Sequence, residues 1–214
     1  MPSLMLALTI LVPIICGLEI LFLGSFKEKG YRPIIIGGSV TTFLLVLIVG
    51  ILYPGAGITI SSPHPMVSFA FKLDEMGVLF TLLVSLLWIF TSFYAFGYME
   101  GTDHARRFYG FFIIALGVTL GIGFSANLVT LYMFYEILTF VTYPLVIHTG
   151  TPEAVRAGKM YLIYSLFGAG LAFTAMFLLS PALETYSFIP HGQVILGLVS
   201  NGYLQKVFIL MFIG

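Results

Sequence analysis

Six continuous apolar runs, each about 20 residues long, constrain the fold of this chain more than any other feature. A helix needs about 20 apolar residues to cross a bilayer, whereas a spanning β-strand needs about ten residues of alternating polarity. We therefore predict an all-α, polytopic membrane protein with helices over residues 4–23, 34–52, 76–98, 108–124, 127–148 and 155–179. Residues 203–214 are also apolar but too few to span, so we expect only the start of a seventh helix there.

The composition agrees with this class and excludes several others. Charged residues make up 8% of the chain, against about 25% in soluble domains. The formal net charge is zero, so no basic surface suggests nucleic acid as a partner. The single cysteine, Cys16, excludes an internal disulfide and any multi-cysteine metal or iron–sulfur site within the chain. No metal or cofactor is expected.

We expect one transmembrane domain over residues 1–214, with one long connection at residues 53–75. Alternating apolar residues at 58–60 and 67–71 predict a short extended hairpin in that connection, lying on the membrane face. Gly117 and Gly121 are four residues apart in one apolar run, a spacing that favours close helix packing.

The distribution of Lys and Arg predicts an orientation. With six spans, seven basic residues fall on one side of the membrane and two, Lys72 and Lys206, on the other. The seven are Lys27, Lys29, Arg32, Arg106, Arg107, Arg156 and Lys159. Because basic loops stay in the cytoplasm, the N-terminus and the connection at 53–75 are expected outside.

Glu136 is the one charged residue in the run 127–148 and lies near its centre. An acidic residue at mid-membrane costs roughly 2.5–3.5 kcal/mol, so such a group usually marks a transport pathway. At about 100° per residue, a polar stripe shares its helix face. The stripe consists of Ser125, Tyr132, Thr139 and Tyr143. The alternative interpretation is a Glu136 that only hydrogen-bonds a neighbouring helix.

Several segments together resemble one family of membrane subunits. They are 71–77 (FKLDEMG), 94–99 (YAFGYM), 107–109 (RFY) and above all 127–138 (NLVTLYMFYEIL), where Tyr135 stands in place of a commoner Trp. Their order and spacing resemble the N-terminal half of antiporter-like subunits. These subunits occur in respiratory complex I, membrane-bound hydrogenases and Mrp-type sodium/proton antiporters, where the D subunit is of this type.

The resemblance implies proton, or sodium/proton, translocation with Glu136 as the buried protonatable site. In the family this glutamate interacts with a lysine of the seventh helix, which would follow residue 214 here. Lys206 lies earlier and is not expected to replace it. Burial favours the neutral form of a carboxyl group and a nearby ammonium favours the charged form, so a movable cation can switch proton affinity.

The segment 157–161 (AGKMY) resembles the family pattern around a second lysine, at the start of the sixth helix. This resemblance points to Lys159. Lys159 lies about one turn inside the cytoplasmic boundary, where both snorkelling to water and proton uptake are open to it. If both helices are straight, Lys159 and Glu136 lie at different depths and cannot be in contact, so water would have to bridge them.

The resemblance also implies a multi-pass location in the plasma (inner) membrane of a bacterium or archaeon. Other membrane subunits are expected as partners, including a chain that supplies the second half of the family fold. The alternative is a truncated homologue that serves as a structural or assembly subunit without transport. No flavin, quinone, haem or cluster motif is visible, so an enzyme acting alone is not expected.

Overall fold

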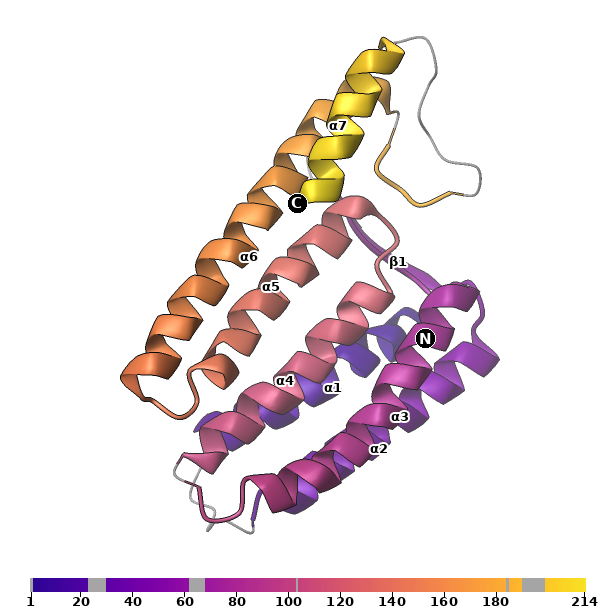
Figure 1. Cartoon of the computed structure of the whole chain (residues 1–214). Helices are drawn as coiled ribbons and strands as arrows, with labels where there is room; N and C mark the ends of the chain where they lie inside the picture. The colour runs from indigo at the N-terminus through magenta and orange to yellow at the C-terminus, as the bar shows by residue number, and fades with distance from the viewer. Residues whose placement is uncertain (1, 23–29, 62–67, 103, 184, 190–198) are drawn as a thin grey trace.

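The computed structural model describes residues 2–22, 30–61, 68–102, 104–183, 185–189 and 199–214. Its elements in chain order are α1 (Pro2–Phe22), α2 (Arg32–Leu52), β1 (Gly57–Ser61), β2 (Ser68–Lys72), α3 (Glu75–Tyr98), α4 (Ala105–Gly123), α5 (Leu128–Val146), α6 (Pro152–Leu179), a 3-10 turn η1 (Ser180–Ala182) and α7 (Asn201–Ile213). Within these residues, α1 to α6 are long and apolar enough to cross a membrane, and α7 is a shorter apolar helix. The predicted helical membrane architecture is confirmed (Figure 1).

Several helices begin earlier than the apolar runs predicted. α2 begins at Arg32, α4 at Ala105 and α6 at Pro152. Hydropathy marks the part of a helix inside the membrane, whereas capping groups and prolines set where the helix starts. At α6, the Thr151 hydroxyl accepts a hydrogen bond from the Ala154 backbone N–H at 3.1 Å, and Pro152 occupies the first turn. The apolar run therefore misses the first turn.

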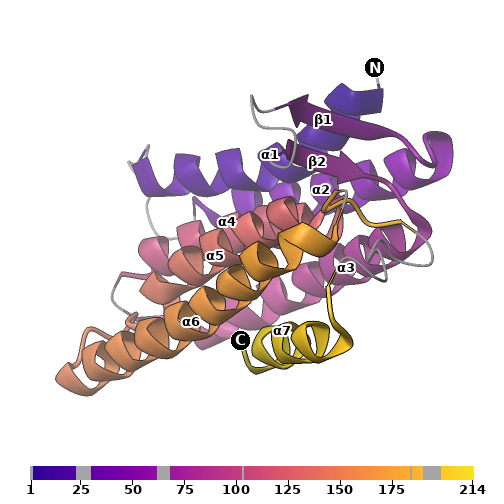
Figure 2. The ribbon, with the colours of Figure 1, turned by 90° about the horizontal axis from the view of Figure 1, so that it is seen from above.

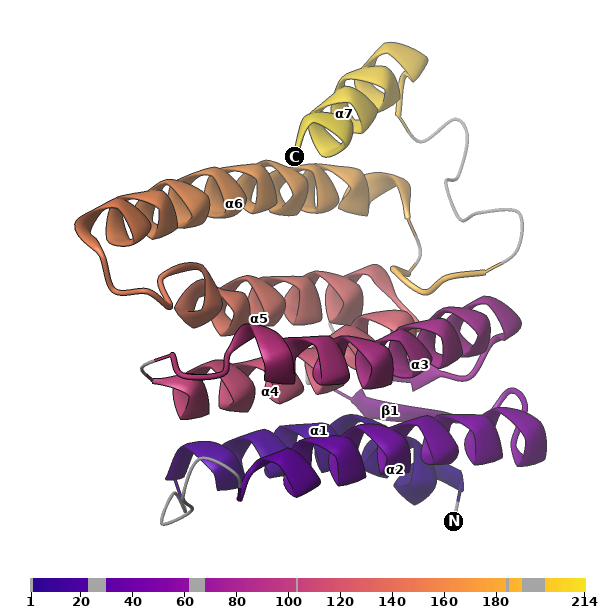
Figure 3. The same ribbon diagram turned by 60° about the horizontal axis from the view of Figure 1, so that its bottom comes forward.

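α4 is the central helix of the bundle. In its apolar window 67% of residues are buried, against 11% in α5. Figure 3 shows α1 and α2 on one side of α4, and α5 followed by α6 and α7 on the other. The core of the molecule therefore lies around α4.

Glycines allow the close contacts of α4. A Cβ atom at Gly117 would lie 2.6 Å from the carbonyl oxygen of Ile10 in α1. A Cβ atom at Gly121 would overlap the ring of Phe134 in α5. The predicted close packing at Gly117 and Gly121 is confirmed, and the two glycines face different neighbours.

The predicted hairpin is also present. β1 and β2 pair antiparallel with Gly57 opposite Lys72, and Figure 2 shows the hairpin at the end of the bundle where α1 begins. Val67, expected in the second strand, lies outside the described residues. Lys27 and Lys29, used in the orientation argument, also lie outside them.

The short connection between α4 and α5, residues 124–127, is bonded on both sides by extended backbone. On one side, the N–H of Lys72 donates to the carbonyl oxygen of Phe124 and the N–H of Ala126 to that of Ala70, both at 2.8 Å. On the other, the N–H of Phe188 donates to the carbonyl of Ala126 at 2.9 Å. This junction fixes the point from which α5 starts.

Candidate functional site

The side chain of Asn127 caps α5 and ties it to the hairpin. Its Oδ1 accepts a hydrogen bond from the Thr130 N–H at 2.7 Å, and its Nδ2 donates to the Ser68 carbonyl at 2.8 Å. The Thr130 hydroxyl oxygen accepts from the Ala70 N–H at 2.9 Å. Because α5 starts at Leu128, Glu136 lies about 12 Å along the helix, near its middle.

The face of α5 that carries Glu136 is turned toward α6. The ring of Tyr132 lies 5.4 Å from the ring of Phe173 in α6. At the other end of the face, a Cβ atom at Gly158 of α6 would lie 3.0 Å from the ring of Tyr143. Glu136 lies between these two tyrosines on the same face, so its carboxyl group is directed toward the α5–α6 interface.

The Glu136 side chain is half-buried, and its Oε1 atom is buried without a hydrogen-bond partner among the described residues. A buried polar atom without a partner costs about 1–3 kcal/mol, and more when it is charged. Such an atom needs a water molecule, a cation or a further donor. This unsatisfied oxygen is the strongest chemical feature of the site.

The polar stripe predicted around Glu136 is only partly a continuous face. Ser125 lies in the extended α4–α5 connection rather than in α5, and its hydroxyl donates to the Gly121 carbonyl at 2.8 Å. Its inclusion in the stripe was wrong, because helical spacing stops at the Asn127 cap. Thr139 is buried, and its hydroxyl donates to the Tyr135 carbonyl at 3.3 Å. Tyr132 and Tyr143 line the interface with α6.

A polar contact between α5 and α6 was missed by the sequence argument. The Thr142 hydroxyl and the Tyr161 hydroxyl lie 2.8 Å apart. Thr142 lies about 100° around the helix from Tyr143, outside the predicted stripe. Only the register of the two helices brings it opposite Tyr161, so the sequence carried no signal for this pair beyond the two hydroxyls themselves.

Lys159 and Lys206 lie away from Glu136. Lys159 is exposed on α6, about 10 Å from the start of that helix, next to the buried Gly158 that contacts α5. Lys206 is exposed in the first half of α7. Within the described part of the chain, no ion pair joins either lysine to Glu136.

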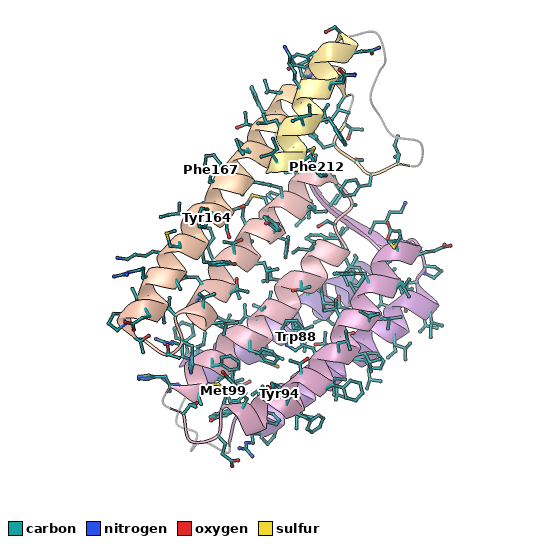
Figure 4. The ribbon with its side chains drawn as sticks, viewed as in Figure 1. Trp88, Tyr94, Met99, Tyr164, Phe167 and Phe212 are labelled. Atoms are coloured by element: carbon teal, nitrogen blue, oxygen red, sulfur yellow. The ribbon has the colours of Figure 1, made fainter. Side chains whose placement is uncertain are left out.

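α7 approaches α6 at the level of Glu136. A Cβ atom at Gly168 would lie 2.8 Å from the carbonyl oxygen of Gly214. The contacts of Tyr132 and Tyr143 with α6 bracket Gly168, so it lies at about the depth of Glu136. Figure 4 shows Phe212 on α7 and Phe167 on α6, both of which are exposed.

His148 lies just beyond α5 and contacts the start of α4. Its carbonyl accepts a hydrogen bond from Nη2 of Arg107 at 2.9 Å, and its ring packs on that of Phe108 at 5.4 Å. Burial lowers the pKa of His148, and the nearby Arg107 and His104 lower it further. The neutral imidazole therefore belongs to a structural contact between α4 and α5.

The six helices of spanning length within the described residues define a polytopic helical membrane protein, and a partly buried carboxyl group lies midway along the fifth. Two family models match successive parts of it. Residues 60–109 match the N-terminus of chain 5 of NADH-ubiquinone oxidoreductase (complex I), and residues 125–214 match the transmembrane region of NADH:quinone oxidoreductase/Mrp antiporter proteins. The chain belongs to this family of antiporter-like membrane subunits.

Curated relatives include the Na⁺/H⁺ antiporter subunit A1 of Staphylococcus aureus strains JH9 and Newman. Each is 31% identical over 127 residues, which cover 59% of this chain and 16% of the relative. The chain thus spans about a sixth of the length of these relatives.

Two solved structures share the fold. A chain of the archaeal membrane-bound sulfane sulfur reductase matches with a TM-score of 0.77 and 16% identity, and a chain of Thermus thermophilus respiratory complex I with 0.73 and 21%. Each match covers 97% of this chain and 43% of the solved chain.

Proposed function

We propose that this chain takes part in proton, or sodium/proton, translocation as a membrane subunit of a multi-subunit redox-driven or Mrp-type complex. Glu136 is its protonatable site. The family supports translocation of a proton or cation, and the bacterial and archaeal relatives support a place in the plasma membrane of such a cell. Other membrane subunits of the complex are its partners.

The observation that carries this proposal is the buried Oε1 of Glu136. A carboxyl group used only for packing would be expected to bond a neighbouring helix, and this oxygen has no such bond within the described residues. A group that binds and releases protons needs room for water or a cation beside it. Glu136 also lies midway along α5, at a depth where an ionisable residue usually marks a transport pathway.

The hydroxyl groups of the α5–α6 interface give this site a route toward the His148 end of α5. Thr142 and Tyr161 lie between Glu136 and that end, and Tyr143 lies beside them. Hydroxyl groups can order bridging water, which conducts protons between groups that do not touch. Lys159 lies further along, where both proton uptake and simple snorkelling fit its exposed position.

The test compares Glu136→Gln with Glu136→Asp in the assembled complex. The amide is nearly isosteric but cannot take up and release the proton, so Glu136→Gln should assemble normally and lose most of its transport. Glu136→Asp should keep part of it. Proton or sodium flux in vesicles is measured, with subunit content checked in the same preparation. Glu153→Gln, an exposed acid at the start of α6, is the matched control and should transport normally.

The same assay tests Lys159 and the alternative function. Lys159→Met should reduce transport strongly if this lysine takes up protons and only mildly if it snorkels. Full transport by a correctly assembled Glu136→Gln complex would remove this residue from the pathway. A structural or assembly subunit without its own transport would then be the better description.

A further inference from the structure

A groove of about 540 Å³ lies between the end of α2 and the start of α3. Figure 1 shows α4 between these two helices and α5, the helix that contains Glu136. Two glycines shape the groove. Gly50 lets α2 approach so closely that a Cβ atom there would lie 2.7 Å from Val78 of α3. Gly55, with a φ of 79°, turns the chain away from α2 into the hairpin. The groove lies between these two points and has a size typical of ligand sites.

The rim of the groove carries charges of both signs. Lys72 ends β2, and Asp74 and Glu75 begin α3. Asp74 Oδ1 accepts a hydrogen bond from the Gly77 N–H at 2.6 Å, which leaves its second oxygen available. Among the described residues, none forms an ion pair with any of these three side chains. One ammonium and two carboxylates therefore face the same opening.

The wall below the rim is apolar. Glu75, Leu79 and Leu82 follow one another at helical spacing, so a strip of leucine runs about 10 Å down α3 from the charged end. Leu79 is 64% exposed. On a spanning helix this arrangement places the charges at headgroup level and the leucines at the level of acyl chains.

We propose that this groove binds one zwitterionic phospholipid with a primary amine, of the phosphatidylethanolamine type. Its phosphate lies against Lys72, its ammonium against Glu75 and the free oxygen of Asp74, and one acyl chain along Leu79 and Leu82. An anionic headgroup would bring its charge next to two carboxylates. A quaternary choline headgroup has no N–H to donate to them, so the primary amine matches the rim better.

The test uses membranes that contain the assembled complex and a phosphatidylethanolamine analogue with a photoreactive acyl chain. Crosslinked peptides are mapped by mass spectrometry, and unlabelled phosphatidylethanolamine, phosphatidylcholine or phosphatidylglycerol competes. Crosslinks should fall on the first two turns of α3. Phosphatidylethanolamine should compete about fivefold better than the other two, which corresponds to one additional net hydrogen bond.

Three variants locate the contacts. Glu75→Gln should lower the preference for the primary amine, because it removes one of the two carboxylates beside the ammonium, and Leu79→Trp should fill the groove and lower the crosslink yield. Leu83→Trp is the matched control, because Leu83 is also exposed on α3 but does not line the groove. Asp74 is not substituted, since loss of its cap would destabilise α3 itself.

Four results would overturn the proposal. Equal competition by phosphatidylcholine would exclude recognition of the amine. Better competition by phosphatidylglycerol would show that the groove binds an anionic headgroup through Lys72 and does not recognise the amine. Crosslinks absent from α3 would exclude lipid in the groove. A Leu79→Cys protein, in a Cys16→Ser background, that forms a disulfide with another subunit would show that a protein partner fills the groove.

Discussion

His148 contributes to a pH-dependent contact between α4 and α5. Its imidazole is partly buried against Phe108, and its pKa is lowered by that burial and by the nearby charges of Arg107 and His104. The folded chain therefore binds fewer protons at His148 than the unfolded chain does. The contact contributes its full stability above the unfolded pKa of about 6.5, and this is lost as the pH falls through the lower folded pKa.

We expect the thermal midpoint in detergent to fall between pH 8 and pH 5 less steeply in His148→Phe than in the unmodified chain. Phenylalanine keeps a ring against Phe108 but cannot be protonated. His104→Asn is the control, since asparagine tolerates the positive φ of 60° at this position and removes only a secondary influence. An unchanged pH slope in His148→Phe would contradict the assignment.

The sequence alone makes Glu136 a candidate site residue, because one charge in an apolar run stands out whatever the helix packs against. The residues that surround Glu136 in the structure could not be predicted from the sequence. Tyr132 and Tyr143 share the predicted face of Glu136 and both contact α6, but the facing residues Phe173 and Gly158 depend on how α6 is placed against α5. The Thr142–Tyr161 pair needs the same information.

At the scale of the helices, the glycine contacts predict how Gly→Ala substitutions change the stability of the fold. Gly117→Ala would place a methyl group 2.6 Å from the backbone oxygen of Ile10, which cannot move without shifting α1. We expect a destabilisation of about 1–3 kcal/mol, as for other overpacked cores. Gly170→Ala meets nothing within 4 Å and should stabilise α6 by up to about 1 kcal/mol through helix propensity.

Unfolding of both variants in detergent or mixed micelles, followed by circular dichroism, measures the difference. The two substitutions make the same chemical change on spanning helices, so each controls for the other. A neutral or stabilising effect of Gly117→Ala would show that the α1–α4 contact is looser than the structure indicates.

Within the described residues, the sequence predicted α1 to α7, and it placed the starts of α3 and α5 within one residue but those of α2, α4 and α6 two to three residues late. The start of α4 at Ala105 precedes its apolar run because Arg106 and Arg107 form the first turn outside the hydrophobic segment. Likewise, hydropathy gives no reason to place α4 rather than another helix at the centre. That position follows from close contacts such as Gly117 on Ile10.

For the whole molecule, the remaining prediction is its orientation. The basic residues predict an N-terminus outside and the α3–α4 turn in the cytoplasm. In a Cys16→Ser background, a membrane-impermeant maleimide should label Thr59→Cys from the outside only and His104→Cys from the inside only. Right-side-out and inverted vesicles make the comparison. Labelling of position 104 from the outside alone would reverse the orientation.

The backbone junction at the start of α5 has a consequence for the order of events during synthesis. The connection between α4 and α5 bonds to Ala70, made earlier, and to Phe188, made about 60 residues later. At about 5–20 residues per second, the ribosome adds that second partner roughly 3–12 s after it has added Ala126. During this interval α5 is held on one side only, so insertion factors would meet a loosely anchored α5 until α6 has followed it.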